Sequence, residues 1–199
     1  MPIGYISVKG EFSNGLKTGI WETFNENGDI FSIGKYVNDY QNGNWKFFHN
    51  SGNLSLEGIF KNGYESGQWI SYYDGGELDE IGEYINGLKD GKWGRFHVGG
   101  SLKQEEIYKL GKLIEVSDFY LSDGNVFKNE TFDNGNGELF DYYEDGNIFS
   151  IAKYKNGLLN GMYSEYHTNG KISQSGMYKN GEKSGTWNEY NRRLSLIHI

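Results

Sequence analysis

The sequence predicts an all-β fold, an elongated single-layer antiparallel sheet of about eight stacked β-hairpin repeats with a period of 24 residues. Three observations predict it. Aromatic residues recur at this period along the chain. Glycine occurs 30 times and proline once, which is typical of many short strands joined by tight turns. Aromatic residues make up 17% of the 199 residues, whereas a disordered glycine-rich chain lacks large side chains to bury.

Two aromatic positions are filled in all eight copies of the repeat. The first aromatic residue of each copy is Phe12, Tyr36, Phe60, Tyr84, Tyr108, Phe132, Tyr154 or Tyr178. The second follows twelve residues later, or ten in the shortened sixth copy, at Phe24, Phe48, Tyr72, Phe96, Tyr120, Tyr142, Tyr166 and Tyr190. A third position between them holds all five tryptophans, with Ser117, Leu139 and Tyr163 in copies five to seven.

Each copy contains two junctions marked by glycine. A pair such as Asn27-Gly28 or Asp145-Gly146 tolerates the positive φ of a type I′ turn, so we expect it to join the two strands of a hairpin. The line NGLKDG at 86–91 and its equivalents are expected to form a longer connection to the next hairpin. A lone hairpin is marginal in water, so stacking of aromatic side chains between copies must supply the burial.

The tryptophan position and the second aromatic position lie three residues apart, as in Trp45 and Phe48. An odd spacing puts two side chains on opposite faces of a flat strand. Either both faces carry aromatic side chains or a β-bulge intervenes, and both arrangements are open at this point.

The pattern G-x-Y-x-N-G-x-x-x-G-x-W-x-x-Y-x-x-x-G resembles the MORN-repeat family over residues 10–191. It is similar in particular to the bacterial MORN-like variant described as a YwqK-type antitoxin of toxin–antitoxin systems. The resemblance implies an elongated sheet of β-hairpins and a role in binding or scaffolding, with links to membrane lipids and dimerisation in the family. It implies no residue-level mechanism. Because such arrays also stand beside catalytic domains, the repeats need not be the active part.

The organisation we expect has three parts: a partial repeat at 1–9, the MORN-like hairpin array at 10–191, and a truncated end at 192–199. Residues Leu194 to Ile199 match an in-frame reading of a transposon-end sequencing adapter, so we expect this tail to be non-native. The alternative is a short apolar tail. Since the array is expected to be a fragment, a further domain could follow it.

Composition and charge narrow the function classes. The net charge of −8 leaves too few Lys and Arg residues for phosphate binding, so we predict no nucleic-acid partner and disfavour anionic membranes. The absence of cysteine fits a cytoplasmic location and excludes thiolate chemistry. His49, His97 and His167 share one repeat position, and copies two apart are about 20 Å from each other, too far to share a metal. We interpret this position as a tolerant surface one, and we predict no catalytic, cofactor or metal-binding residues.

Two surfaces are candidates for binding. The stretch 113–151 contains nine acidic residues and one basic residue, and could dock a basic partner; the alternative is solvated strand-edge charge. The candidate acidic residues are Glu115, Asp118, Glu138, Asp141, Glu144 and Asp145. The tryptophans could form an exposed aromatic surface, or they could be the core of the sheet. The candidate aromatic residues are Trp21, Trp45, Trp69, Trp93 and Trp187.

These observations lead to the hypothesis that the chain is a non-catalytic protein-interaction or scaffold protein. Like an antitoxin, it would bind a partner protein, and that partner would be basic. The first alternative is a module that binds glycans or lipid headgroups through aromatic side chains. The second is the repeat appendage of a truncated enzyme. Open sheet edges also make self-association plausible.

Overall fold

The computed structural model describes residues 7–192 and 196–197. The expected partial repeat at 1–9 and the expected non-native tail at 194–199 therefore fall largely outside the described residues. The chain divides into two compact units, residues 1–101 and residues 102–199. The described residues contain no helix, and therefore none that is long and apolar enough to cross a membrane.

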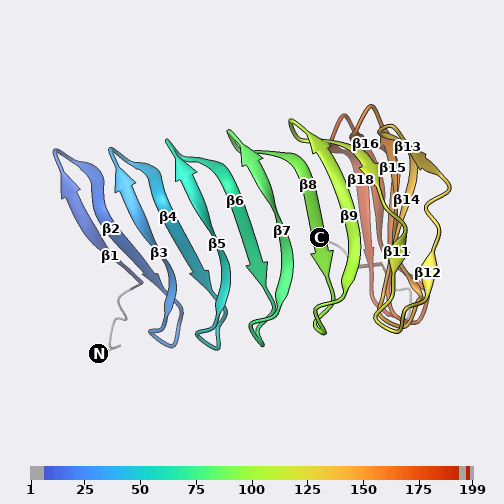
Figure 1. Cartoon of the computed structure of the whole chain (residues 1–199), viewed down its shortest axis with the longest axis horizontal. Coiled ribbons are helices and arrows are strands. Elements are labelled where there is room, and N and C mark those ends of the chain that lie inside the picture. Colours follow the sequence, from blue (N-terminus) through green and yellow to red (C-terminus); the bar gives the residue numbers. More distant parts are fainter. Residues whose placement is uncertain (1–6, 193–195, 198–199) are drawn as a thin grey trace. The chain divides into compact units, whose positions relative to one another are not determined.

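The first unit is a sheet in which each strand pairs antiparallel with the next one along the chain (Figure 1). Its strands are β1 (Val8–Ser13), β2 (Leu16–Phe24), β3 (Ile30–Val37), β4 (Tyr40–Phe48), β5 (Leu54–Lys61), β6 (Tyr64–Tyr72), β7 (Leu78–Ile85) and β8 (Leu88–Phe96). The predicted all-β fold of stacked hairpin repeats is confirmed.

The second unit has the same antiparallel hairpins, but its pairing is interrupted. Strand β9 (Leu102–Lys109) pairs with β10 (Lys112–Val116), and β11 (Phe119–Tyr120) pairs with β12 (Val126–Phe127). A further sheet holds β13 (Phe132–Asp133), β14 (Asn136–Tyr142), β15 (Ile148–Lys155), β16 (Leu158–Tyr166), β17 (Ile172–Lys179), β18 (Glu182–Tyr190) and β19 (Leu196–Ile197). The interruptions fall in copies five and six, where the repeat is least regular.

The two junctions of each copy exchange the roles that we predicted for them. Ile85 pairs with Leu88, so Asn86 and Gly87 alone form the turn, at φ 50° and 79°. Positive φ at both central residues is the requirement of a type I′ turn, which Asn-Gly meets. The predicted turn at Asn27-Gly28 is wrong: Phe24 pairs with Ile30, and only Gly28 of that pair has positive φ, so residues 25–29 form a longer loop.

The second glycine of each NGxxxG line lies in a β-bulge inside the hairpin. Gly34 pairs with Trp45 but Lys35 pairs with Asn42, so the two residues between Asn42 and Trp45 have no partner on β3. One of these two is Gly43, at φ 81°, where a side chain would be strained. The register shifts again between Phe47 and Phe48, but the extra residue there is Ser55 on β5, not a residue between the two aromatic positions. The Tyr72 hydroxyl donates to Glu57, which pairs with Ile70 on the face opposite Trp69, so both faces of the sheet carry aromatic side chains.

The core of the first unit is one row of aromatic rings. Trp45 packs edge-to-face against Tyr36 at 5.3 Å and against Phe60 at 5.8 Å between ring centroids, and the same alternation runs from Phe12 to Trp93. The indole Nε1 of Trp45 donates a hydrogen bond to the carbonyl oxygen of Lys35 beside the bulge, at 3.2 Å. The bulge thus buries the indole and satisfies its polar atom together.

Candidate functional site

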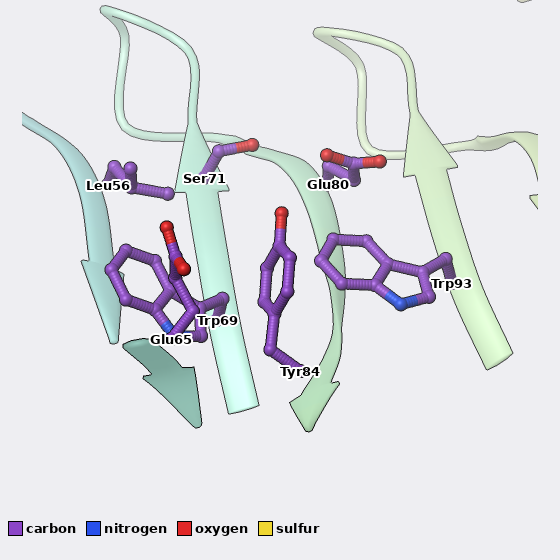
Figure 2. A pocket seen from close by; sticks show the side chains of 7 residues that line it. All are labelled: Leu56, Glu65, Trp69, Ser71, Glu80, Tyr84 and Trp93. Atoms are coloured by element: carbon purple, nitrogen blue, oxygen red, sulfur yellow. The ribbon is translucent and has the colours of Figure 1, made fainter. Parts of the chain in front are cut away.

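A small pocket opens on the face of the first unit that carries the tryptophans, here called the tryptophan face. It spans strands β5 to β8 and has a volume of about 100 Å³ (Figure 2). Its lining residues are Leu56, Glu65, Trp69, Ser71, Glu80, Tyr84 and Trp93.

Strand register places these side chains on one face. Glu65 pairs with Phe60, Glu80 with Ser71, and cross-strand partners project to the same side of an antiparallel sheet. Figure 2 shows the ring of Tyr84 standing between the indoles of Trp69 and Trp93, with the Glu65 carboxylate in front of Trp69.

The aromatic rings form a rigid floor for the pocket. Trp69 and Tyr84 lie 6.0 Å apart between centroids, and Tyr84 and Trp93 lie 5.0 Å apart, both nearly perpendicular. The indoles of Trp69 and Trp93 are 4% and 2% exposed, so packing against neighbouring side chains fixes their orientation. Each also donates its Nε1 hydrogen to a backbone carbonyl, Trp69 to Ile59 and Trp93 to Glu83, at 3.2 Å.

The two carboxylates of the pocket differ in their partners. Glu80 accepts an ion-paired hydrogen bond from Lys89 Nζ at 2.7 Å, and the same ammonium lies 3.9 Å from the ring centroid of Trp93. Glu65 is half-buried and has no ion pair among the residues that the structure describes. Burial raises the pKa of the Tyr84 hydroxyl above its ordinary value, and the charges of Glu80 and Glu65 raise it further.

The position of Glu65 in its copy holds lysine in three other copies. Lys17 Nζ lies 4.4 Å from the ring centroid of Trp21 and 4.9 Å from that of Tyr36. Lys89 and Lys183 each lie 3.9 Å from the ring centroid of their own tryptophan, Trp93 and Trp187. These copies therefore supply their own cation to the aromatic row.

Four of the five tryptophans of the predicted aromatic surface lie in the core. Trp21, Trp45, Trp69 and Trp93 are 2–4% exposed, and Trp187 is half-buried. An exposed row of indoles is therefore not what the fold presents, because a single-layer sheet has to bury its largest rings between its own strands. What reaches solvent over this row is the polar layer to which Glu65 and Lys17 belong.

The predicted acidic segment lies in the second unit, and part of it is occupied by local contacts. Asp118 accepts hydrogen bonds from Lys128 Nζ at 2.7 Å and from the backbone N–H of Asn129 at 2.9 Å, and these contacts hold the pKa of its carboxyl below the ordinary value. Glu138 is 3.4 Å from Lys153 Nζ.

The remaining acidic candidates are spread over two strands, β10 and β14, and the loop that follows β14. Asp145 closes its own loop through two hydrogen bonds from Asn147, and Asp141 accepts one from the backbone N–H of Tyr142. Glu115 on β10 and Glu144 are exposed. In the described part of the chain, no group of three or more His, Cys, Asp or Glu side chains is close enough to hold a metal ion.

The position shared by His49, His97 and His167 has a structural role. The interpretation of it as a merely tolerant surface position is wrong. His49 Nε2 donates to the carbonyl oxygen of Tyr72 and His167 Nε2 to that of Tyr190, both at 2.8 Å. Tyr73 and Tyr143, at the same position in their copies, donate their hydroxyls to Phe96 and Tyr166. Each contact joins one copy to the next. The sequence showed which residues share the position, but not that it faces a backbone carbonyl.

Sequence reasoning also missed the pocket. Its signal was present in the repeat, where Lys17, Lys89 and Lys183 give way to Glu65. That signal has meaning only once strand pairing places Glu65 opposite Phe60, on the face of the aromatic row.

The chain was compared with known proteins. Five segments match the family model described as MORN repeat variant: residues 17–38, 41–62, 65–86, 135–156 and 159–180. Together they span more than half of the chain, and the unmatched stretch between them, 87–134, includes the irregular fifth copy. No curated protein matches the chain.

Proposed function

Because this chain belongs to the MORN repeat variant family, we propose that it is a non-catalytic interaction protein that binds a partner protein along the tryptophan face of its first unit. MORN repeats are generally associated with protein and membrane binding. For this chain we propose protein binding.

The pocket is the observation that carries the proposal. A buried aromatic floor gives it a fixed shape, and Glu65 offers a carboxylate that is in no ion pair among the described residues. A rigid aromatic floor with a few polar groups at its rim is the arrangement that anchors partner side chains in protein interfaces. The carboxylates at this rim favour a basic partner.

The same charges disfavour the lipid alternative, because anionic headgroups attract Lys and Arg clusters and are repelled by carboxylates such as Glu65. Burial of the tryptophans disfavours the glycan alternative, since stacking on a sugar needs an accessible ring face. An antitoxin-like role is a narrower form of the proposal, in which the basic partner is a toxin.

Site-specific photocrosslinking tests the proposal. A photoreactive phenylalanine analogue replaces Gln41 on the tryptophan face in one variant of the full chain, and Gln68 on the opposite face in a matched variant. Gln41 pairs with Tyr36, whereas Gln68 precedes Trp69 and so projects away from it. Each variant is irradiated in a cell lysate, and the adducts are identified by mass spectrometry.

We expect one protein to be crosslinked near one-to-one from position 41 and not from position 68. Crosslinking from position 68 alone, or from neither position, would contradict the proposal. The identity of the captured protein would then test the antitoxin-like form of it.

A further inference from the structure

We propose that the pocket at Trp69 and Tyr84 binds the ammonium group of a lysine side chain that the partner protein inserts. This inference rests on the proposed function for the source of the lysine, but the pocket chemistry can be tested without any partner.

The chain itself shows which group fits between these two rings. In the first copy, the Lys17 ammonium lies between Trp21 and the next first-position aromatic residue, Tyr36, 4.4 Å and 4.9 Å from the two ring centroids. Trp69 and Tyr84 are the same two positions two copies later. An ammonium held between two aromatic rings at such distances is stabilised by their negative faces.

The third copy has the same rings but the opposite charge. Where the first copy has Lys17, the third has Glu65, and its carboxylate lies in front of Trp69 (Figure 2). The neighbouring Glu80 is already paired with Lys89 at 2.7 Å, whereas Glu65 has no ion pair among the described residues. The site thus keeps the two rings of an ammonium site and adds an uncompensated carboxylate, so a cation from outside would complete it.

The dimensions and lining favour lysine among cationic groups. A volume of about 100 Å³ admits the end of one side chain. An ammonium is a compact charge on an apolar stem, and Leu56 at the rim gives that stem a surface to pack on. The second copy serves as an internal contrast, because Gln41 takes the equivalent position there and brings no charge.

Nuclear magnetic resonance titration of the full chain tests the proposal. The probe is N-acetyl-lysine methylamide, with its uncharged N6-acetylated form as the control ligand, and the readout is the set of indole N–H signals. We expect the Trp69 signal to shift saturably with a Kd of about 1–10 mM, the range of a single-group contact. We expect the signals of Trp21 and Trp45 to stay in place, and the acetylated probe to have no effect.

Three variants make the result specific. Glu65→Lys restores the residue of the lysine-bearing copies and supplies the cation internally, so the chain should fold and the titration should be lost. Glu65→Gln keeps the shape and should weaken binding about tenfold. Glu83→Gln, on the same strand as Tyr84 but exposed on the opposite face, should bind like the wild type.

A Trp69 signal that does not respond, or that responds equally in the Glu65→Lys variant, overturns the inference. If this happens while the partner is still crosslinked from position 41, the proposed function survives without the lysine pocket. If Trp69 responds to the lysine probe but no partner is captured, the pocket stands and the proposed function does not. A stronger response to tetramethylammonium than to the lysine probe would also count against a lysine side chain and indicate a free small cation.

Discussion

Gly34 lies directly beneath the indole of Trp45: a Cβ atom at position 34 would be 2.1 Å from Cδ2 of that ring. The relationship holds in every copy that has a tryptophan, with Gly10, Gly58, Gly82 and Gly176 beneath the other four indoles. In the three copies without tryptophan the same position holds Glu106, Glu130 and Ala152. The glycine and the tryptophan therefore form one structural element of the repeat, present or lost together.

Replacing Gly58 with alanine should destabilise the first unit, because the new methyl group would lie 2.2 Å from Cδ2 of the buried Trp69 ring. We expect a loss of about 2–3 kcal/mol in the free energy of unfolding, measured by urea denaturation. The matched control is Gly99→Ala, since a Cβ at position 99 meets no atom within 4 Å. A Gly58→Ala variant as stable as the control would contradict the packing account.

The hydrogen bonds between successive copies can be tested with Tyr143→Phe. The Tyr143 hydroxyl donates to the carbonyl oxygen of Tyr166 at 2.5 Å, and phenylalanine keeps the ring but leaves this carbonyl without its donor. We expect the free energy of unfolding, followed by thermal denaturation, to fall by about 1 kcal/mol. Tyr64→Phe removes a hydroxyl from a side chain that is 60% exposed, and should leave the thermal midpoint unchanged. Equal effects of the two substitutions would show that the hydroxyl of Tyr143 contributes nothing.

Copy five offers a stabilising substitution. Leu110 has φ 46°, in the first position of a tight turn that asparagine occupies in the other seven copies. A left-handed conformation is strained for leucine and tolerated by asparagine, so Leu110→Asn should raise the free energy of unfolding by about 1 kcal/mol. Leu110→Val, with a branched Cβ, should lower it. The two variants are compared by thermal denaturation, and a destabilised Leu110→Asn protein would refute the turn assignment in this copy.

Alkaline pH should weaken the second unit through Tyr163. Burial, together with the Glu165 charge and the hydrogen bond to Glu165, raises the pKa of its hydroxyl from 10.0 to about 12. The folded state thus favours the neutral phenol, so this contribution to stability is complete below pH 10 and is lost as the pH rises toward 12. Tyr163→Phe, which does not titrate, should gain stability relative to the wild type across that window.

Urea denaturation at several pH values checks this prediction. Tyr40→Phe is the control, because Tyr40 is 59% exposed and its replacement should not change the pH dependence. If the difference between Tyr163→Phe and the wild type is the same at neutral and alkaline pH, Tyr163 is not the residue responsible.

Much of the fold was predictable because the sequence pattern of one hairpin recurs in eight copies. The aromatic positions recur with nearly constant spacing, so a residue that fits the pattern by chance in one copy is recognised by comparison with the other copies. The roles of the two glycine junctions were not predictable from type alone, since both contain Asn-Gly or Asp-Gly pairs. Only the register, with Ile85 opposite Leu88 and Phe24 opposite Ile30, shows which junction is the two-residue turn.

The candidate site was predicted less well than the fold. The sequence pointed to the tryptophans and to acidic residues of copies five and six, whereas the pocket is formed by Glu65 and Tyr84 over a buried floor. Position 65 belongs to no aromatic slot, and its equivalents are as different as Lys17 and Gly137. Position 65 matters because its side chain lies over the buried indole of Trp69.

The period of 24 residues is enough to identify a β-hairpin repeat stabilised by aromatic rings, because periodicity is a property of the sequence. The tertiary structure alone decided which face each side chain occupies. The bulge at each second glycine inserts two residues, Gly43 and Asn44 in the second copy, so the alternation of faces continues along the strand while the cross-strand pairing shifts. The position of Trp69 over Gly58 and that of Glu65 opposite Phe60, in front of Trp69, both follow from this pairing.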